Sequence, residues 1–247
     1  MDREQARQES HQRYLEHRFE APRIIRGRGI PCVVWAEDAL KHYGVPILPF
    51  ELFVLVDDVD AATQCLKAAR YTTAEPRQSE SLPELMEGSS RLLQPPASGG
   101  DLESAVPFHQ TVVVLLPASR WKCSLPSAPA SSHISASDPF PFPSLPALLD
   151  SVIDAWLDAP ATYFATHVNC HLAYLYDYVD QVRTPGFVDE LYPAHREFHL
   201  RYVSEPIRGS KRLEWRRRRD AFLADGGEHL ANANAVSRRE ENTRGPP

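Results

Sequence analysis

The stretch from Gly29 to Asp60 restricts the fold of this chain more than any other part of the sequence. It contains two apolar runs, Pro31–Trp35 and Ile47–Val56, and the second is interrupted only by Glu51. A run of that length, rich in Val, Ile and Phe, is typical of a strand buried in the centre of a sheet. We therefore expect a β-sheet core built around residues 47–56.

Helix signals flank the second apolar run on both sides. Ala36–Tyr43 has a helical pattern and ends at Gly44, a residue that commonly terminates helices. After the run, Asp58 and Asp60 stand where an N-cap and a first-turn acid belong, in front of a helix expected at Ala61–Ala69. The sequence around the second apolar run therefore predicts the order helix, strand, helix.

The remaining pattern divides the chain into an α/β half and a helical half. We expect a short strand at Tyr71–Thr73 and a long strand at Phe108–Leu116, joined by a polar loop over 75–105 with one helical turn at Leu82–Met86. Beyond residue 144 the apolar period becomes helical. The helices expected there are Leu145–Leu157, Ala161–Val182, Phe187–Val203 and Ser210–Leu223.

The expected fold class is α+β, with a small mixed β-sheet flanked by helices and followed by a C-terminal helical region. Proline is unusually frequent, with 22 Pro against 11 Gly, and is concentrated in the middle of the chain. Composition predicts five segments: a polar N-terminal tail (1–22), an α/β domain (23–125), a Pro/Ser-rich linker (126–144), a helical region (145–225) and a polar C-terminal tail (226–247).

Charge and composition exclude several classes of protein. The net charge is −6 and the isoelectric point is about 5.9, so we expect no binding to nucleic acid or to an anionic membrane. No apolar run is long enough to span a membrane, and the first twenty residues lack the apolar core of a signal peptide. The four cysteines have no CxxC spacing, which argues against a zinc knuckle. We expect a cytoplasmic protein, with the nucleus as the alternative.

From Val34 to Val56 the sequence resembles the nucleotidyltransferase fold in its minimal, AbiEii-like form. That family has a strand-to-helix turn with a pair of small residues, a helix ending in Tyr-Gly, and a strand with two alternating acids. The corresponding residues here are Ala36-Glu37, the segment ALKHYG at 39–44, and Glu51-Leu52-Phe53. The resemblance implies the same mixed sheet and helical C-terminal half that the pattern predicts.

The resemblance also implies a metal site, but this sequence lacks some of the acids that form it. In active members two alternating carboxylates and a third acid on a neighbouring strand bind divalent metals, which activate the attacking hydroxyl and hold the triphosphate. Glu51 occupies the first position and is the candidate catalytic and metal-binding residue. Phe53 occupies the second position, and the strand that starts at Phe108 offers no acid. Mg²⁺ and a nucleoside triphosphate are the cofactors that an active site would need; without activity we expect none.

The pair of residues that holds the phosphate in that family also differs in this chain. The family has Gly-Gly or Gly-Ser where this chain has Ala36 and Glu37, and a carboxylate repels a triphosphate. Arg26 and Arg28, in an Arg-Gly-Arg-Gly stretch, are further candidates for phosphate binding, although such a stretch is commonly only a turn. We expect Glu51 to face solvent alone or to pair with Arg26 or Arg28.

Three functions are therefore compatible with the sequence. The first is a non-catalytic or degenerate nucleotidyltransferase-fold protein that binds a nucleotide or a protein partner. The second is an active metal-dependent transferase that uses Glu51 together with Asp57 or Asp58, although helix capping explains the acids in front of the helix more simply. The third is a helical interaction module on an α/β scaffold.

Two histidine pairs in the helical half are candidate metal ligands. His167 with His171, and His195 with His199, are each spaced four residues apart, which places both rings on one face of a helix. Two such helices in contact would make a four-histidine site. The alternative is that His171 is a core histidine and that His195 and His199 lie on a solvated face.

The run Arg216–Arg219 permits two interpretations. Four consecutive arginines contact phosphates in some proteins and act as an import signal in others. Because Glu214 and Asp220 flank the run, a solvated helix face is the simpler prediction.

Overall fold

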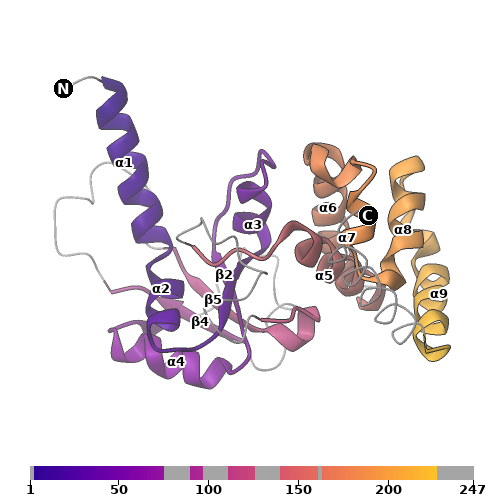
Figure 1. The fold of residues 1–247 in the computed structure, drawn as a ribbon. Helices are drawn as coiled ribbons and strands as arrows, with labels where there is room; N and C mark the ends of the chain where they lie inside the picture. Colours follow the sequence, from indigo (N-terminus) through magenta and orange to yellow (C-terminus); the bar gives the residue numbers. More distant parts are fainter. Residues whose placement is uncertain (1–2, 75–89, 97–110, 126–139, 161–162, 227–247) are drawn as a thin grey trace, which may run out of the picture.

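The computed structural model describes residues 3–74, 90–96, 111–125, 140–160 and 163–226. These residues form an α+β fold, a five-stranded mixed sheet flanked by helices and followed by a helical region, as the sequence predicts (Figure 1). The elements of the first half are α1 (Arg3–Arg18), α2 (Glu20–Gly27), β1 (Cys32–Trp35), α3 (Ala36–His42), β2 (Leu52–Val56), α4 (Val59–Ala68), β3 (Thr72–Thr73), β4 (Arg91–Gln94) and β5 (Val113–Pro117).

The second half is helical throughout its described residues. A short 3-10 helix, η2 (Ala118–Trp121), follows β5, and the helices from residue 145 onward lie beside the sheet (Figure 1). The elements of the second half are η2, α5 (Leu145–Asp158), α6 (Tyr163–Tyr178), η3 (Asp180–Arg183), α7 (Phe187–Glu190), α8 (Pro193–Ser204), η4 (Gly209–Lys211) and α9 (Arg212–Ala224). No helix in the described part of the chain is both long and apolar enough to cross a membrane.

The sheet has the strand order β1-β2-β5-β4-β3, in which only β2 and β5 run parallel. Strand β2 is fully buried, because it has a neighbour on each side and Phe53 pairs with Trp35 on β1 and with Val114 on β5. Helices α2 and α4 pack on each other and on the strands, and α3 packs on β1, β2 and α6 (Figure 1). Helix α3 therefore joins the sheet to the helical region.

Several strands differ from those expected. Strand β2 begins only at Leu52, and residues 47–51 run irregularly into it. Strand β5 covers Val113–Pro117 rather than 108–116, of which 108–110 lie outside the described residues. Strand β4 was not expected at all; it forms by pairing with β5, with Leu93 in the core. The helical turn expected at 82–86 also lies outside the described residues.

The helices of the second half follow the prediction with two interruptions. Helix α6 covers most of the range 161–182, and η3 completes it. The helix expected over 187–203 is divided into α7 and α8, because Pro193 lacks a backbone N–H and occupies the first turn of α8. Helices α5 and α9 lie close to the ranges expected for them.

The segment expected to be a polar tail contributes to the interior. It contains α1 and the start of α2, and Arg18 and Phe19 at the junction of these helices are buried. The Arg18 guanidinium donates from Nε to Asp38 Oδ1 and from Nη2 to Asp38 Oδ2, both at 2.7 Å. It also donates to the backbone oxygen of Glu51 at 3.1 Å and to Thr111 Oγ1 at 3.2 Å. The Arg18 side chain thus connects α1 with α3 and with the residues just before β2 and β5.

A single apolar core runs through both halves. The Trp121 ring in η2 lies 5.4 Å from that of Trp35 on β1 and 5.6 Å from that of Phe164 on α6. The end of the expected linker is also packed, since the backbone N–H of Val34 donates to Pro141 O at 2.7 Å. Residues 126–139 of that linker lie outside the described residues.

The buried Arg18–Asp38 pair generates the first prediction. Burial raises the pKa of the Asp38 carboxyl, whereas the bidentate contact with Arg18 favours its charged form. Asp38→Ala leaves the guanidinium charge buried without its counter-ion, so we expect a loss of about 3–5 kcal/mol in the free energy of unfolding.

Urea unfolding followed by circular dichroism measures this loss. The matched control is Asp60→Ala, which removes an exposed ion pair with Arg91 and is expected to cost less than about 1 kcal/mol. Equal effects of the two substitutions would contradict the role given to Arg18.

Candidate functional site

The turn between β1 and α3 has an unusual backbone. Ala36 has a φ of 55°, in the left-handed region that glycine adopts readily and other residues avoid. For an L-residue this conformation costs roughly 1–2 kcal/mol. The turn starts α3 directly after the strand and places Glu37 in the first helical turn, on the side of α3 that packs on α6.

Glu37 meets both histidines of the first pair across this junction. Its Oε1 lies 3.6 Å from Nε2 of His171 and 3.8 Å from Nε2 of His167. The exposed fractions of the three side chains are 15% for Glu37, 19% for His167 and 4% for His171. Within the described residues, this is the group of three His, Cys, Asp or Glu side chains whose ligand atoms lie close enough to hold a metal ion.

The electrostatics of the cluster follow from its burial. Burial raises the pKa of Glu37, but the nearby imidazole of His171, the backbone and His167 outweigh it and hold that pKa below its usual value. Burial, reinforced by the charge of His171, lowers the pKa of His167 to about 4. Near neutral pH the cluster therefore contains a carboxylate and a neutral His167 imidazole.

The acids expected from the nucleotidyltransferase resemblance are not brought together. Glu51 is half-buried one residue before β2, and its backbone oxygen accepts from Arg18. Asp57 and Asp58 follow the other end of the strand, about 20 Å away for six residues of extended chain. Asp58 caps α4, its Oδ1 accepting from the backbone N–H of Ala61 at 2.8 Å.

These positions do not fit the two Mg²⁺ ions that the family implies. The place of the second carboxylate is taken by Phe53, which is 1% exposed between β1 and β5. Strand β5 adds only apolar side chains. A single carboxylate cannot hold two hard cations, which require several oxygen ligands each.

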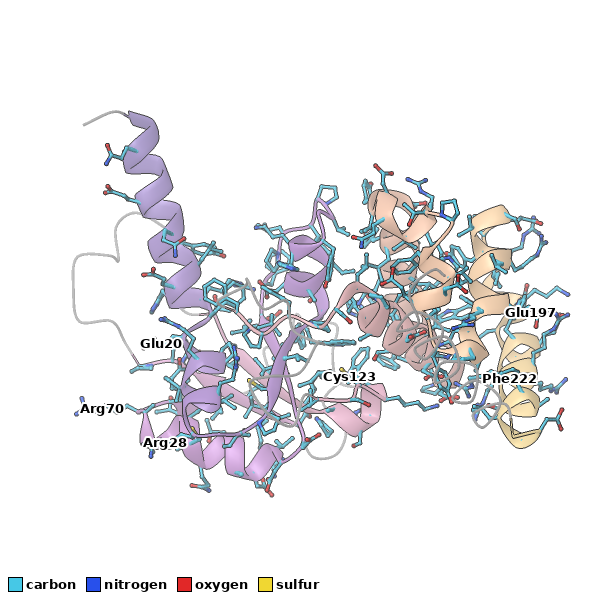
Figure 2. The ribbon with its side chains drawn as sticks, in the orientation of Figure 1. Glu20, Arg28, Arg70, Cys123, Glu197 and Phe222 are labelled. Carbon is cyan, nitrogen blue, oxygen red and sulfur yellow. The ribbon has the colours of Figure 1, made fainter. Side chains whose placement is uncertain are left out.

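The two arginines proposed for phosphate binding lie elsewhere. Arg26 is in the last turn of α2, and Arg28 is exposed just after that helix. Figure 2 shows Arg28 on the side of the sheet half that faces away from the helical region. Glu37, in contrast, faces the helical region through its contacts with α6. The four candidates for phosphate binding, Ala36, Glu37, Arg26 and Arg28, therefore do not form one site.

The second histidine pair forms a separate environment. His195 and His199 on α8 are buried, which corrects the prediction of a solvated face for them. His199 Nδ1 lies 3.0 Å from the Tyr176 hydroxyl. His195 Nδ1 lies 2.7 Å from Asp150 Oδ1, and its Nε2 lies 3.2 Å from Asp154 Oδ1. The four histidines do not converge, so the four-histidine site is not formed.

The same acids neutralise part of the arginine run. Arg219 is buried on α9 and donates to Asp154 Oδ1 and Asp158 Oδ1, both at 2.6 Å. Arg216–Arg218 are exposed, as a solvated face predicts, but Arg219 is not. Lys122 also contacts Asp154 and Asp158. The result is a partly buried network of charges between α5, α8, α9 and Lys122, which directly follows η2.

Sequence reasoning missed the partners of both histidine pairs. Glu37 was interpreted as a repulsive neighbour of phosphate, since no local pattern relates it to residues 130 positions away. A signal did exist for the second pair: Asp150, Asp154 and Asp158 are spaced four residues apart on α5, an otherwise apolar helix. A row of acids on a buried helix requires cationic partners, and this requirement points to His195 and Arg219.

Comparison with known proteins adds no assignment for these residues. No protein-family model matches the sequence, and no curated protein matches it. The chemistry of the Glu37 cluster and the His195 network is therefore argued from their geometry alone.

The His195 network generates a prediction of pH-dependent stability. Burial alone would lower the pKa of His195, but hydrogen bonding and charge from Asp150 and Asp154 raise it to about 9. The folded pKa exceeds the unfolded value near 6.5, so the stabilisation is complete below pH 6.5 and is lost as pH rises through 9. The expected loss is at most about 3 kcal/mol.

Denaturant unfolding at pH 6.0 and pH 9.5 measures this difference, with His195→Gln as the comparison. The variant is less stable at pH 6.0, and its stability should change much less between the two pH values. An unchanged pH dependence in the variant would show that another group is responsible.

Proposed function

We propose that this chain is a nucleotidyltransferase-like protein that does not transfer nucleotides and acts by binding a protein partner. One observation carries the proposal. The turn from β1 to α3, which holds the triphosphate in the family that the sequence resembles, here presents Glu37 to the chain's own helix α6. The place of an incoming phosphate is taken by a carboxylate and two imidazoles.

Features of the α/β half support the relationship to that family. A strand-to-helix turn with a left-handed backbone at Ala36 suits the glycine that the family has there. Helix α3 ends before Gly44, whose φ is 93°, and leads to the central strand β2. A helix and then a strand parallel to β2 follow. Each of these belongs to the layout that the resemblance implies.

The side chains of the same half argue against catalysis. Phe53 is a buried sheet residue and cannot bind a cation. Glu37 would repel a triphosphate at the turn. The alternative of an active transferase needs Glu51 and Asp57 or Asp58 within about 4–6 Å of one another, the range of strong charge interaction. The strand between them keeps these acids apart.

The helical half offers the surface that favours a protein partner. Leu200 on α8 is 58% exposed and Leu213 on α9 is 56% exposed. A groove of about 670 Å³ lies between these helices, with Trp215 in its lining. Figure 2 shows Glu197 and Phe222 at this end of the molecule, which faces away from the sheet half. Exposed apolar side chains beside a groove are typical of interaction surfaces.

Isothermal titration with MgATP and MnATP tests the proposal. We expect neither wild type nor Glu51→Gln to bind either complex, because one carboxylate cannot hold the metal ions. Asp57→Asn is the matched control at the opposite end of β2. Metal-dependent binding by wild type that Glu51→Gln weakens tenfold or more would overturn the proposal, and weakening by Asp57→Asn as well would support the active transferase.

A further inference from the structure

The Glu37, His167 and His171 side chains contain what a transition-metal site requires. They supply two imidazole nitrogens and a carboxylate oxygen, the ligands that Zn²⁺ and its neighbours in the first transition row prefer. Mg²⁺ and Ca²⁺ prefer sets made of oxygen only. We propose that these three residues bind one divalent transition-metal ion, with Zn²⁺ as the best match.

The distances are close to those of a loaded site. Two ligand atoms bound to a tetrahedral ion at about 2.0–2.1 Å lie roughly 3.4 Å apart. Glu37 Oε1 lies 3.6 Å from His171 Nε2 and 3.8 Å from His167 Nε2. The ligand atoms of all three residues lie within 4.8 Å of one another, so side-chain adjustments bring them around one ion.

Unpartnered polar atoms lie in the same place. Glu37 Oε2 and His167 Nε2 are buried and, within the described residues, accept or donate no hydrogen bond. Native proteins rarely leave such atoms without a partner, and each case requires an explanation. A metal ion bound by His167 Nε2 supplies the missing partner for that nitrogen, and it also supplies one for Glu37 Oε2 when the carboxylate binds through both of its oxygens.

The second histidine pair shows that spacing alone does not make the site. His195 and His199 have the same four-residue spacing on α8. Nδ1 of His195 lies beside Asp150, and Nδ1 of His199 lies beside the Tyr176 hydroxyl. Among the described residues, the pair on α6 differs in having one carboxylate, that of Glu37, near both of its rings. His199 therefore serves as a control for the test.

Three protein ligands leave one position of a tetrahedral ion for an external ligand. The Glu37 and His167 side chains are 15% and 19% exposed, whereas Glu37 Oε2 and His167 Nε2 are themselves buried, so the external ligand would occupy a largely enclosed position. His171 is buried as well. The ligands come from α3 and α6, so the ion would also fasten the sheet half to the helical half and stabilise the folded chain by mass action.

Titration with Co²⁺ tests the proposal, because cobalt in a tetrahedral or five-coordinate site absorbs visible light far more strongly than hydrated cobalt. The full chain is used without an affinity tag, after treatment with a chelator. We expect one Co²⁺ per chain, displaced by one Zn²⁺. Glu37→Gln and His167→Gln should each weaken Co²⁺ binding at least tenfold.

Two controls separate this site from other ligands. Cys170→Ser removes the exposed thiol on α6 that lies nearest in sequence to the histidine pair, and His199→Gln changes the second pair. Both should bind Co²⁺ as wild type does. The midpoint of thermal unfolding should rise with Zn²⁺ in wild type and in these controls, but not in Glu37→Gln or His167→Gln.

The proposal is overturned if wild type binds no Co²⁺ in a one-to-one complex, a result that does not depend on whether any variant folds. It is also overturned if Glu37→Gln and His167→Gln, folded by circular dichroism, bind Co²⁺ as tightly as wild type. Neither outcome depends on whether the protein binds nucleotides.

Discussion

The buried ion pair between Arg18 and Asp38 is the interaction on which the candidate site depends. Arg18 comes from the end of a helix that looks like a polar tail, yet its guanidinium holds the first turn of α3 through Asp38 and the approach to β2 through the Glu51 backbone. Because Asp38 adjoins Glu37, the pair fixes the segment that presents Glu37 to α6. An ion pair of this kind is valuable for the geometry that it specifies, since its desolvation cost offsets much of its attraction.

The turn that follows β1 contributes one of the contacts between the sheet half and the helical half. It presents the Glu37 carboxylate to imidazoles from the helical half, at the position where the proposed relationship would place a phosphate. Under the proposed relationship to that family, Glu37 argues against a phosphate at this turn and also supplies an oxygen ligand beside two imidazole nitrogens. The non-catalytic proposal and the metal proposal begin from this one residue, although each can fail without the other.

Local patterns predicted the parts of the fold that local physics determines. The helix ending before Gly44, the Asp58 cap and helix α5 follow from chain geometry, capping and apolar period, and the structure confirms them. Strand β4 was missed because its four residues become a strand only by pairing with β5. The burial of Arg18, His195 and Arg219 was missed for the same reason: each depends on an acid far away in sequence. His171 was expected in the core and lies there, but its facing carboxylate comes from the other half of the chain.

The most direct test of this account is a crystal structure of the chain grown with Zn²⁺, with data collected on both sides of the zinc absorption edge. The account predicts an anomalous peak between α3 and α6, at about 2.0–2.2 Å from a Glu37 carboxylate oxygen and from one nitrogen each of His167 and His171. A zinc peak elsewhere, with Glu37 turned away from α6, would contradict it.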